Sequence, residues 1–279
     1  MTFVDPTHVF KGKLIFTVPH MDDCVLACGG TIAKLPNKEQ VHIIYATDGM
    51  RSPTPIIPWR DRISEDLGEV RMKEAREAMG SLGVPEENIY FLNLPEARLK
   101  SYTRALLGLL EELIEQIKPD HILTPFRYDR HPDHLALNRL LTTACHRGVY
   151  NAALTEYFVY YRWRLLPEGD VRKYINPQYL VKVNIEEVSA QKRAALDCFR
   201  SQTTKFYEWQ TRPNLTPQLL EEVSGAPEFF LRYDESLPGP KIFSHAITWI
   251  RIAHKLEPFL KKNKDRTVAF CCRTFNRND

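Results

Sequence analysis

The first half of the chain alternates short apolar runs with longer segments of helical periodicity, and this order constrains the fold more than any other feature. The spacing predicts strands that are each followed by a helix. Such a succession is typical of an α/β protein with a Rossmann-like, mostly parallel sheet that has helices on both faces. In that class, ligands bind beyond the carboxyl ends of the strands. The expected strands are 13–18, 41–47, 88–92 and 121–124, and the expected helices are 23–35, 64–82, 104–117 and 134–145.

The second half of the chain is less regular, with five prolines and few clear periods over residues 203–240. We expect a single domain in which residues 1–205 form the main α/β unit. Residues 206–279 then form a C-terminal extension packed on or beside that unit. The pattern here predicts strands over 154–162 and 179–183 and a helix over 185–201.

Two further segments stand out by composition. Residues 50–61 contain three prolines between a strand and a helix, so we expect a loop that is placed to cover a substrate. Residues 243–262 predict an amphipathic helix that ends in basic residues. The simplest interpretation is a helix packed on the core with a solvated basic tail. The alternative is a surface helix that contacts anionic lipid or another subunit, and a homo-oligomer is compatible with the sequence.

The overall composition is that of an ordinary globular protein, with 43% hydrophobic and 26% charged residues. A net charge of +3 is too small on its own to indicate binding to nucleic acid. No apolar run reaches ~18 residues, and the first residues lack the continuous apolar core of a signal peptide. The spacing of the six cysteines suggests reduced thiols rather than disulfides or a cysteine zinc site, so we expect a cytoplasmic protein.

Two polar clusters follow two of the expected strands at the point where each strand ends. The first is His20-Met21-Asp22-Asp23 and the second is His131-Pro132-Asp133-His134. Because parallel strands end at the same edge of a sheet, three imidazoles and three carboxylates are expected to meet there. Such a set can hold a divalent metal ion and still leave an acid and a base free for chemistry.

The spacing within the clusters suggests which residues are the ligands. A catalytic zinc ion usually has three protein ligands and one open position. His20 and Asp23 lie three residues apart at a strand-to-helix turn, and His134 can supply the third ligand from the other loop. We therefore predict one Zn²⁺ per chain, with another divalent ion such as Fe²⁺ as the alternative.

The remaining members of the clusters are candidates for proton transfer. Asp22 is the candidate base for the attacking water, and His131 is the candidate general acid or oxyanion stabiliser. Asp133 can hydrogen-bond an imidazole and fix its tautomer, and a carboxylate beside His131 would favour the charged imidazolium. These roles predict a bell-shaped dependence of the rate on pH, with His131 responsible for the alkaline limb.

The first cluster and the residues after it, 19–33, resemble the signature of the PIG-L/LmbE-like deacetylases, usually P/A-H-P-D-D-E-x-x-x-x-G-G-T-I. The second cluster resembles their later H-P-D-H motif. The similarity covers about residues 12–205. That family comprises zinc-dependent enzymes that remove acyl groups, mostly acetyl from N-acetylglucosamine-type sugars. The resemblance therefore implies that residues 1–205 form a deacetylase domain acting on a small sugar or glycoconjugate.

The chain departs from the family signature at two positions. Met21 replaces the usual proline, and Cys24 replaces the usual glutamate after the two aspartates. We assign that glutamate no ligand role, so we expect metal binding to be retained. Its replacement weakens the inference that this chain acts on the usual substrate of the family. The resemblance implies the same roles as the chemistry above: zinc ligands His20, Asp23 and His134, general base Asp22, and acid on the oxyanion side His131.

Three residues outside the clusters are candidate substrate-binding residues. Arg71 in the long helix either binds substrate phosphate or hydroxyl groups or forms a salt bridge with Glu74. Asp48 either lines the pocket or caps a turn. Tyr128 either polarises the substrate carbonyl or belongs to a solvated loop.

The function that these observations favour is hydrolysis of an N-acetyl group on an N-acetylglucosamine-type sugar or its conjugate. A different reaction at the same metal site, such as hydration of an unsaturated acid, is the alternative. A non-catalytic binding protein is disfavoured because both Asp22 and His131 are present. A nicotinamide-dependent dehydrogenase is disfavoured because no G-x-G-x-x-G follows the first strand.

Overall fold

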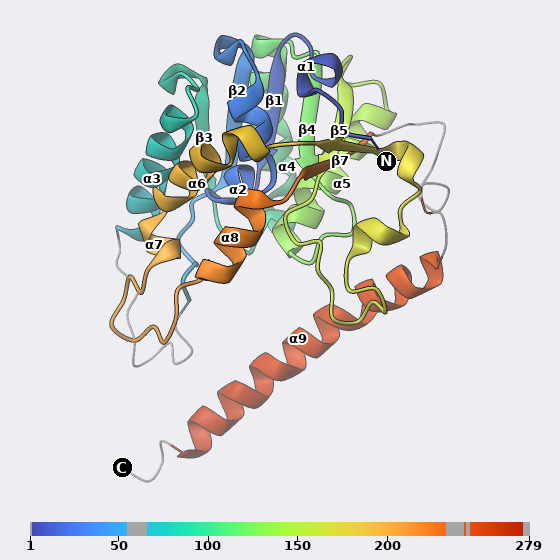
Figure 1. Ribbon diagram of the computed structural model, residues 1–279. Coiled ribbons are helices and arrows are strands. Elements are labelled where there is room, and N and C mark those ends of the chain that lie inside the picture. Colours follow the sequence, from blue (N-terminus) through green and yellow to red (C-terminus); the bar gives the residue numbers. More distant parts are fainter. Residues whose placement is uncertain (1, 55–65, 233–242, 244–245, 276–279) are drawn as a thin grey trace.

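The computed structural model describes residues 2–54, 66–232, 243 and 246–275. Within these residues the strands form one seven-stranded sheet in the order β3-β2-β1-β4-β5-β7-β6 (Figure 1). The first five strands are parallel, and β7 is antiparallel to both of its neighbours. The strands are β1 (Leu14–Val18), β2 (Val41–Thr47), β3 (Ile89–Leu94), β4 (His121–Pro125), β5 (Ala153–Tyr157), β6 (Leu180–Val183) and β7 (Glu228–Arg232).

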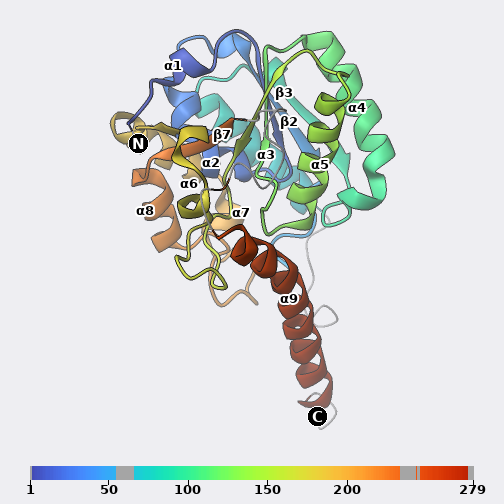
Figure 2. The ribbon, with the colours of Figure 1, turned by 90° about the vertical axis from the view of Figure 1, so that its right-hand side faces the viewer.

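Helices cover both faces of this sheet, as the alternating pattern predicted (Figure 2). Every residue of β1 is buried, which explains why the strand is an apolar run rather than an alternation of apolar and polar residues. Phe16 belongs to the core cluster on one face and Ile15 to the cluster on the other. The first face is covered by α2 (Asp23–Lys34), α3 (Leu67–Ser81) and α6 (Ser189–Asp197), and the second by α4 (Thr103–Ile117) and α5 (Pro132–His146).

The ends of the helices follow from local residue chemistry. α5 begins with His131 as the N-cap and Pro132 in its first turn. Proline is tolerated there because the backbone N–H groups of the first turn have no hydrogen-bond partner within the helix. α3 ends before Gly83, whose φ of +85° is the left-handed conformation that favours glycine. The glycine predicted to end the long helix is therefore found in that role, although the first residues of the predicted helix, 64 and 65, lie outside the described residues.

The second half differs from the sequence prediction in several elements. The helix predicted over 185–201 is divided into α6 and α7 (Arg200–Thr203). β7 and α8 (Pro217–Gly225), which the pattern did not predict, lie in the expected C-terminal extension. Because β7 pairs with both β5 and β6, this part of the chain completes the sheet.

α9 (Ile247–Phe275) is longer than the helix predicted over 243–262 and extends beyond the rest of the molecule in Figures 1 and 2. Its first turns pack on a third core cluster through Ile250 and Ala253. No helix in the described part of the chain is long and apolar enough to cross a membrane.

Two smaller predictions concern the loop and the cysteines. Most of the loop predicted over 50–61 lies outside the described residues, so its role over a substrate stays a prediction. Among the described residues, Cys24, Cys28 and Cys198 are free thiols.

Candidate active site

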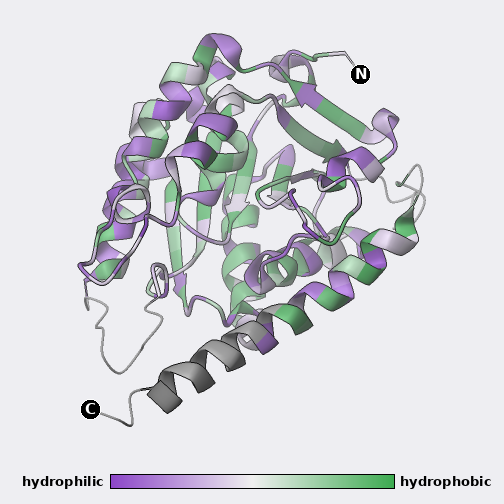
Figure 3. Ribbon diagram, turned by 60° about the horizontal axis from the view of Figure 1, so that its bottom comes forward, coloured by the Kyte–Doolittle hydropathy of each residue, from purple (hydrophilic) through white to green (hydrophobic). Residues whose placement is uncertain are grey.

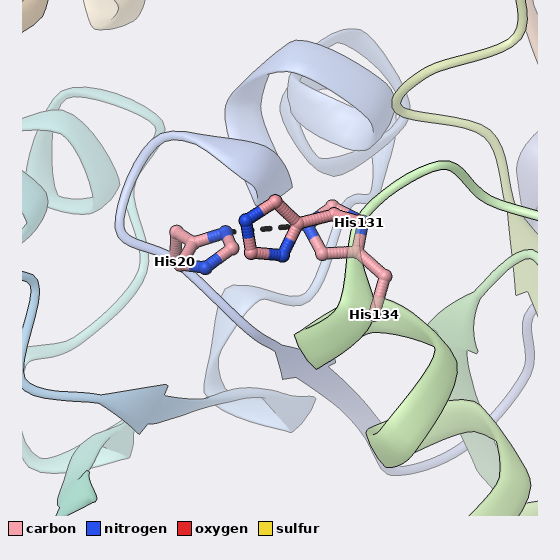
Figure 4. Close-up of side chains that lie close together, drawn as sticks. All are labelled: His20, His131 and His134. Carbon is pink, nitrogen blue, oxygen red and sulfur yellow. Dashed lines mark hydrogen bonds between the residues drawn. The ribbon is translucent and has the colours of Figure 1, made fainter. Parts of the chain in front are cut away.

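The two polar clusters meet beyond the carboxyl ends of β1 and β4. These two strands are hydrogen-bonded neighbours, and the strand order reverses between them, which is where open α/β sheets bind ligands. His20 comes from the turn between β1 and α2, and His131 and His134 come from the first turn of α5 (Figure 4). One nitrogen from each of these three imidazoles lies within 4.8 Å of the other two.

Three of the polar atoms form a tight triangle. Asp23 Oδ2 lies 2.9 Å from His20 Nδ1 and 3.0 Å from His134 Nε2. The two nitrogens are 3.2 Å apart. All three side chains are buried. The predicted ligands are therefore already gathered at one point.

This triangle fits a divalent metal ion. Tetrahedral zinc holds nitrogen and oxygen ligands at about 2.0–2.2 Å, which separates the ligand atoms by about 3.3 Å. Among the described residues, Asp23 Oδ1 is buried without a hydrogen-bond partner. Burial raises the pKa of Asp23, but His134 and His20 outweigh burial and lower that pKa below its usual range, so the group is a carboxylate. The residues present can thus hold one metal ion.

Two further carboxylates contact the imidazole nitrogens that lie outside the triangle. Asp133 Oδ2 lies 3.3 Å from His20 Nε2, and Asp129 Oδ1 lies 3.2 Å from His134 Nδ1. In both imidazoles the nitrogen away from the triangle faces a carboxylate, which fixes the tautomer and the orientation of the ring. The tautomer-fixing role predicted for Asp133 therefore has a geometric counterpart, and its partner is His20.

The environment of His131 differs from the prediction. The Asp133 carboxylate accepts backbone N–H groups from Ala97 and Leu99, and it is 4.0 Å from His131 Nδ1. Burial lowers the pKa of His131 to about 2, and the neighbouring His20 and His134 act in the same direction. Asp133 acts in the expected direction and raises the pKa of His131, but burial and the like charges of His20 and His134 outweigh this one carboxylate.

The neutral ring of His131 has a defined tautomer. The backbone N–H of Asp133 donates to His131 Nδ1 at 3.2 Å, as expected of a helix N-cap. Because Nδ1 is an acceptor, the ring proton is on Nε2. His131 can therefore donate a hydrogen bond while it remains uncharged.

Asp22, the candidate base, is buried beside an arginine. Arg71 Nη2 donates to Asp22 Oδ1 at 3.1 Å, and Arg71 Nη1 lies 3.4 Å from Glu96 Oε2. Burial raises the pKa of Asp22, and the Arg71 guanidinium opposes that rise. Asp22 makes no capping hydrogen bond at the start of α2, so its carboxylate is not used by the helix.

The substrate-binding candidates Arg71 and Asp48 both have intramolecular partners. Arg71 is only 1% exposed, and its ion pairs are with Asp22 and Glu96 rather than with Glu74, which accepts hydrogen bonds from Ser201. Asp48 Oδ1 accepts the backbone N–H groups of residues 50 and 96, so it orders the turn after β2. The turn-capping alternative for Asp48 matches this geometry.

Tyr128, the third candidate, is partly buried against the third core cluster. Its ring contacts Phe126, Phe243 and the imidazole of His254 in α9. These contacts do not match the solvated-loop alternative, and the carbonyl-polarising role stays a prediction. The ring that stacks on His134, with centroids 5.4 Å apart, is that of Tyr160.

The sequence interpretation missed Asp129, Glu96 and Tyr160. Asp129 is two residues before His131, and its carboxylate also accepts the backbone N–H groups of His131 and Tyr160. Its position directly before the second motif is a signal that could have identified it. Glu96 and Tyr160 lie far along the chain from the first motif, so only the fold brings them to the site.

Fold and site together define an α/β protein with a place for one divalent metal ion at the reversal point of its sheet. Residues 15–145 match the family model described as PIG-L: GlcNAc-PI de-N-acetylase. The chain is 30% identical over 127 residues to the diacetylchitobiose deacetylase of Thermococcus kodakarensis, which is 44% of this chain and 45% of that protein. It therefore spans about half the length of that curated relative.

Two longer matches support the same assignment. The chain is 27% identical over 209 residues to the probable N-acetyl-alpha-D-glucosaminyl L-malate deacetylase 2 of Bacillus cereus, covering 70% of this chain and 86% of that protein. The structure of N,N'-diacetylchitobiose deacetylase from Pyrococcus horikoshii shares the fold, with a TM-score of 0.62 and 22% identity over 88% of this chain and 91% of that chain. The match to the family model over residues 15–145 and these deacetylase relatives support the PIG-L/LmbE-like family that the motifs predicted.

Proposed function

We propose that this protein is a zinc-dependent hydrolase that removes the N-acetyl group from an N-acetylglucosamine-type sugar or its conjugate. The observation that supports this most is the triangle of His20 Nδ1, Asp23 Oδ2 and His134 Nε2, with edges of 2.9, 3.0 and 3.2 Å. The family match and the sugar deacetylases among the curated relatives support the substrate class.

The proposed reaction uses residues on both sides of the triangle. His20, Asp23 and His134 would hold a divalent ion, which would supply polarisation of the amide carbonyl and a lower pKa for a water molecule. Asp22 takes the proton of the attacking water and passes it to the leaving amine. His131 donates its Nε2–H to the oxygen that develops negative charge. Arg71, which is buried and donates a hydrogen bond to Asp22 Oδ1, holds that carboxylate in place.

Acetate release tests this proposal. The zinc-loaded protein is incubated with N-acetylglucosamine, N,N'-diacetylchitobiose and the malate and inositol conjugates of N-acetylglucosamine. We expect acetate from at least one of them, loss of that activity after chelation, and recovery on adding zinc. No acetate from any N-acetylated sugar, with full metal occupancy, would exclude a sugar deacetylase.

His134→Ala is expected to lose most of the bound metal, because it removes one of three ligand atoms that converge on one point. Elemental analysis of the dialysed protein measures this directly. Tyr160→Phe is the matched control, because it keeps the ring that stacks on His134. Full metal occupancy in His134→Ala would show that the ligand set is wrong.

The pH profile is expected to lack a limb from His131. With a pKa of about 2, the imidazole is neutral from roughly pH 6 to 9, so raising the pH removes no proton from it. His131→Ala should lower kcat/KM by about 10²–10³-fold, and His131→Gln should lose less because its amide still donates a hydrogen bond. If the pH profile has an alkaline limb in the wild type and none in His131→Gln, His131 does not act as an uncharged hydrogen-bond donor.

A further inference from the structure

α9 presents two different apolar faces. Ile250 and Ala253, which are 0% and 1% exposed, pack on the third core cluster. A second set recurs at spacings of three and four residues and therefore lies on another side of the helix. This apolar stripe consists of Trp249, Ile252, Leu256, Phe259 and Leu260, which are 42–60% exposed.

The stripe is the main exposed apolar surface among the described residues. Five of their eleven exposed large apolar side chains lie in it, and the other six are on separate segments. Figure 3 shows apolar positions alternating with polar ones along the N-terminal part of α9, and Figures 1 and 2 show the helix extending beyond the body. Single exposed apolar residues need no explanation, but a continuous row of them marks an interaction surface.

A row of basic residues borders the stripe. Arg251, Lys255 and Lys262 are exposed and share a side of the helix adjacent to the apolar positions. Residues 247–266 contain six lysine and arginine residues and two acidic ones. One of those two, Glu257, is half-buried and ion-paired with Arg130, so it does not neutralise the basic row.

The surface beside α9 has the same charge. A groove of about 1170 Å³ separates the helix from α4 and α5, and its walls are largely apolar. Five of the six charged residues that line the groove are basic: Lys100, Arg130, Arg139, Arg147 and Lys262, against the single acidic residue Glu111. Both α9 and the neighbouring body are therefore suited to an anionic partner.

A second copy of the chain is a poor occupant for the stripe. Pairing two α9 helices along it would place the basic rows of both copies beside each other, where like charges repel. An anionic phospholipid surface complements both features, because the apolar side chains enter the acyl boundary and the basic ones meet the phosphates. Charge thus decides between the two occupants.

We propose that α9 binds in the plane of an anionic phospholipid bilayer, through its apolar stripe and its basic row. The ion pair between Glu257 of α9 and Arg130, the residue before His131, connects the helix to the edge of the candidate active site. A chain docked in this way holds that edge next to the membrane surface. This inference concerns binding alone and does not depend on the reaction proposed above.

Vesicle sedimentation with the full chain tests the proposal. We expect binding to vesicles of phosphatidylcholine with 30% phosphatidylglycerol, at least about 10-fold weaker binding to pure phosphatidylcholine, and weaker binding in high salt. Phe259→Glu and Leu256→Glu should each weaken binding by about 10-fold or more. Phe3→Glu is the matched control, because Phe3 is 52% exposed and lies on a different segment. Circular dichroism and thermal unfolding verify that each variant is folded.

Three outcomes would overturn the proposal. The first is a wild-type chain that does not sediment with the anionic vesicles. The second is a folded Phe259→Glu variant that binds as well as Phe3→Glu. The third is a wild-type chain with twice the monomer mass by light scattering whose Phe259→Glu variant is monomeric, because a second copy then covers the stripe.

Discussion

Asp22→Asn is expected to keep the metal and to lower turnover by about 10²–10⁴-fold, the usual cost of removing a general base. The amide has nearly the shape of the carboxylate and can still accept the hydrogen bond that Arg71 Nη2 donates at 3.1 Å. It cannot take a proton from the attacking water. Single-turnover rates on the substrate found in the acetate screen, together with metal content, measure the effect.

A structural cause of the loss can be separated from a chemical one. Asp22→Asn should retain the thermal stability of the wild type, because Arg71 can still donate to the amide oxygen and remains ion-paired with Glu96. Asp48→Asn is the matched control, since the same change then affects a carboxylate that only orders a turn. Wild-type turnover in metal-replete Asp22→Asn would exclude Asp22 as the base.

Lys192→Met is expected to lower the free energy of unfolding by about 3–5 kcal/mol, the usual cost of removing one partner of a buried ion pair. Lys192 is 1% exposed, and its Nζ donates to Glu228 Oε1 at 2.8 Å and to the carbonyl of Leu26 at 2.9 Å. The Glu228 carboxylate also accepts the backbone N–H groups of Gly30 and Thr31. Its charge would remain buried without its cation.

Urea unfolding of the wild type and of Lys192→Met measures this difference in the free energy of unfolding. Lys173→Met is the control, because Lys173 is 60% exposed and its pair with Glu168 is expected to contribute at most about 1 kcal/mol. A loss in Lys192→Met no larger than that in Lys173→Met would show that the buried pair does not stabilise the fold.

The sequence by itself determined the α/β class, because apolar runs and helical periods depend only on residues that are close together in the chain. It also predicted β2 with its observed bounds, Val41–Thr47, and the two clusters at the ends of β1 and β4. Because the strands are parallel, the two clusters meet at one edge of the sheet. The sequence could therefore predict that His20, Asp23 and His134 lie close together.

Only the tertiary structure decided the partners of these residues. Arg71 reaches Asp22 across 49 residues, although Glu74 is nearer in sequence, and Asp133 reaches His20 rather than His131. Glu228 joins the sheet in β7 and there meets Lys192 and the backbone of α2. Such pairings depend on which elements pack together, because an ion pair or hydrogen bond forms only between groups that folding brings close to each other. No local pattern in the sequence records those distances.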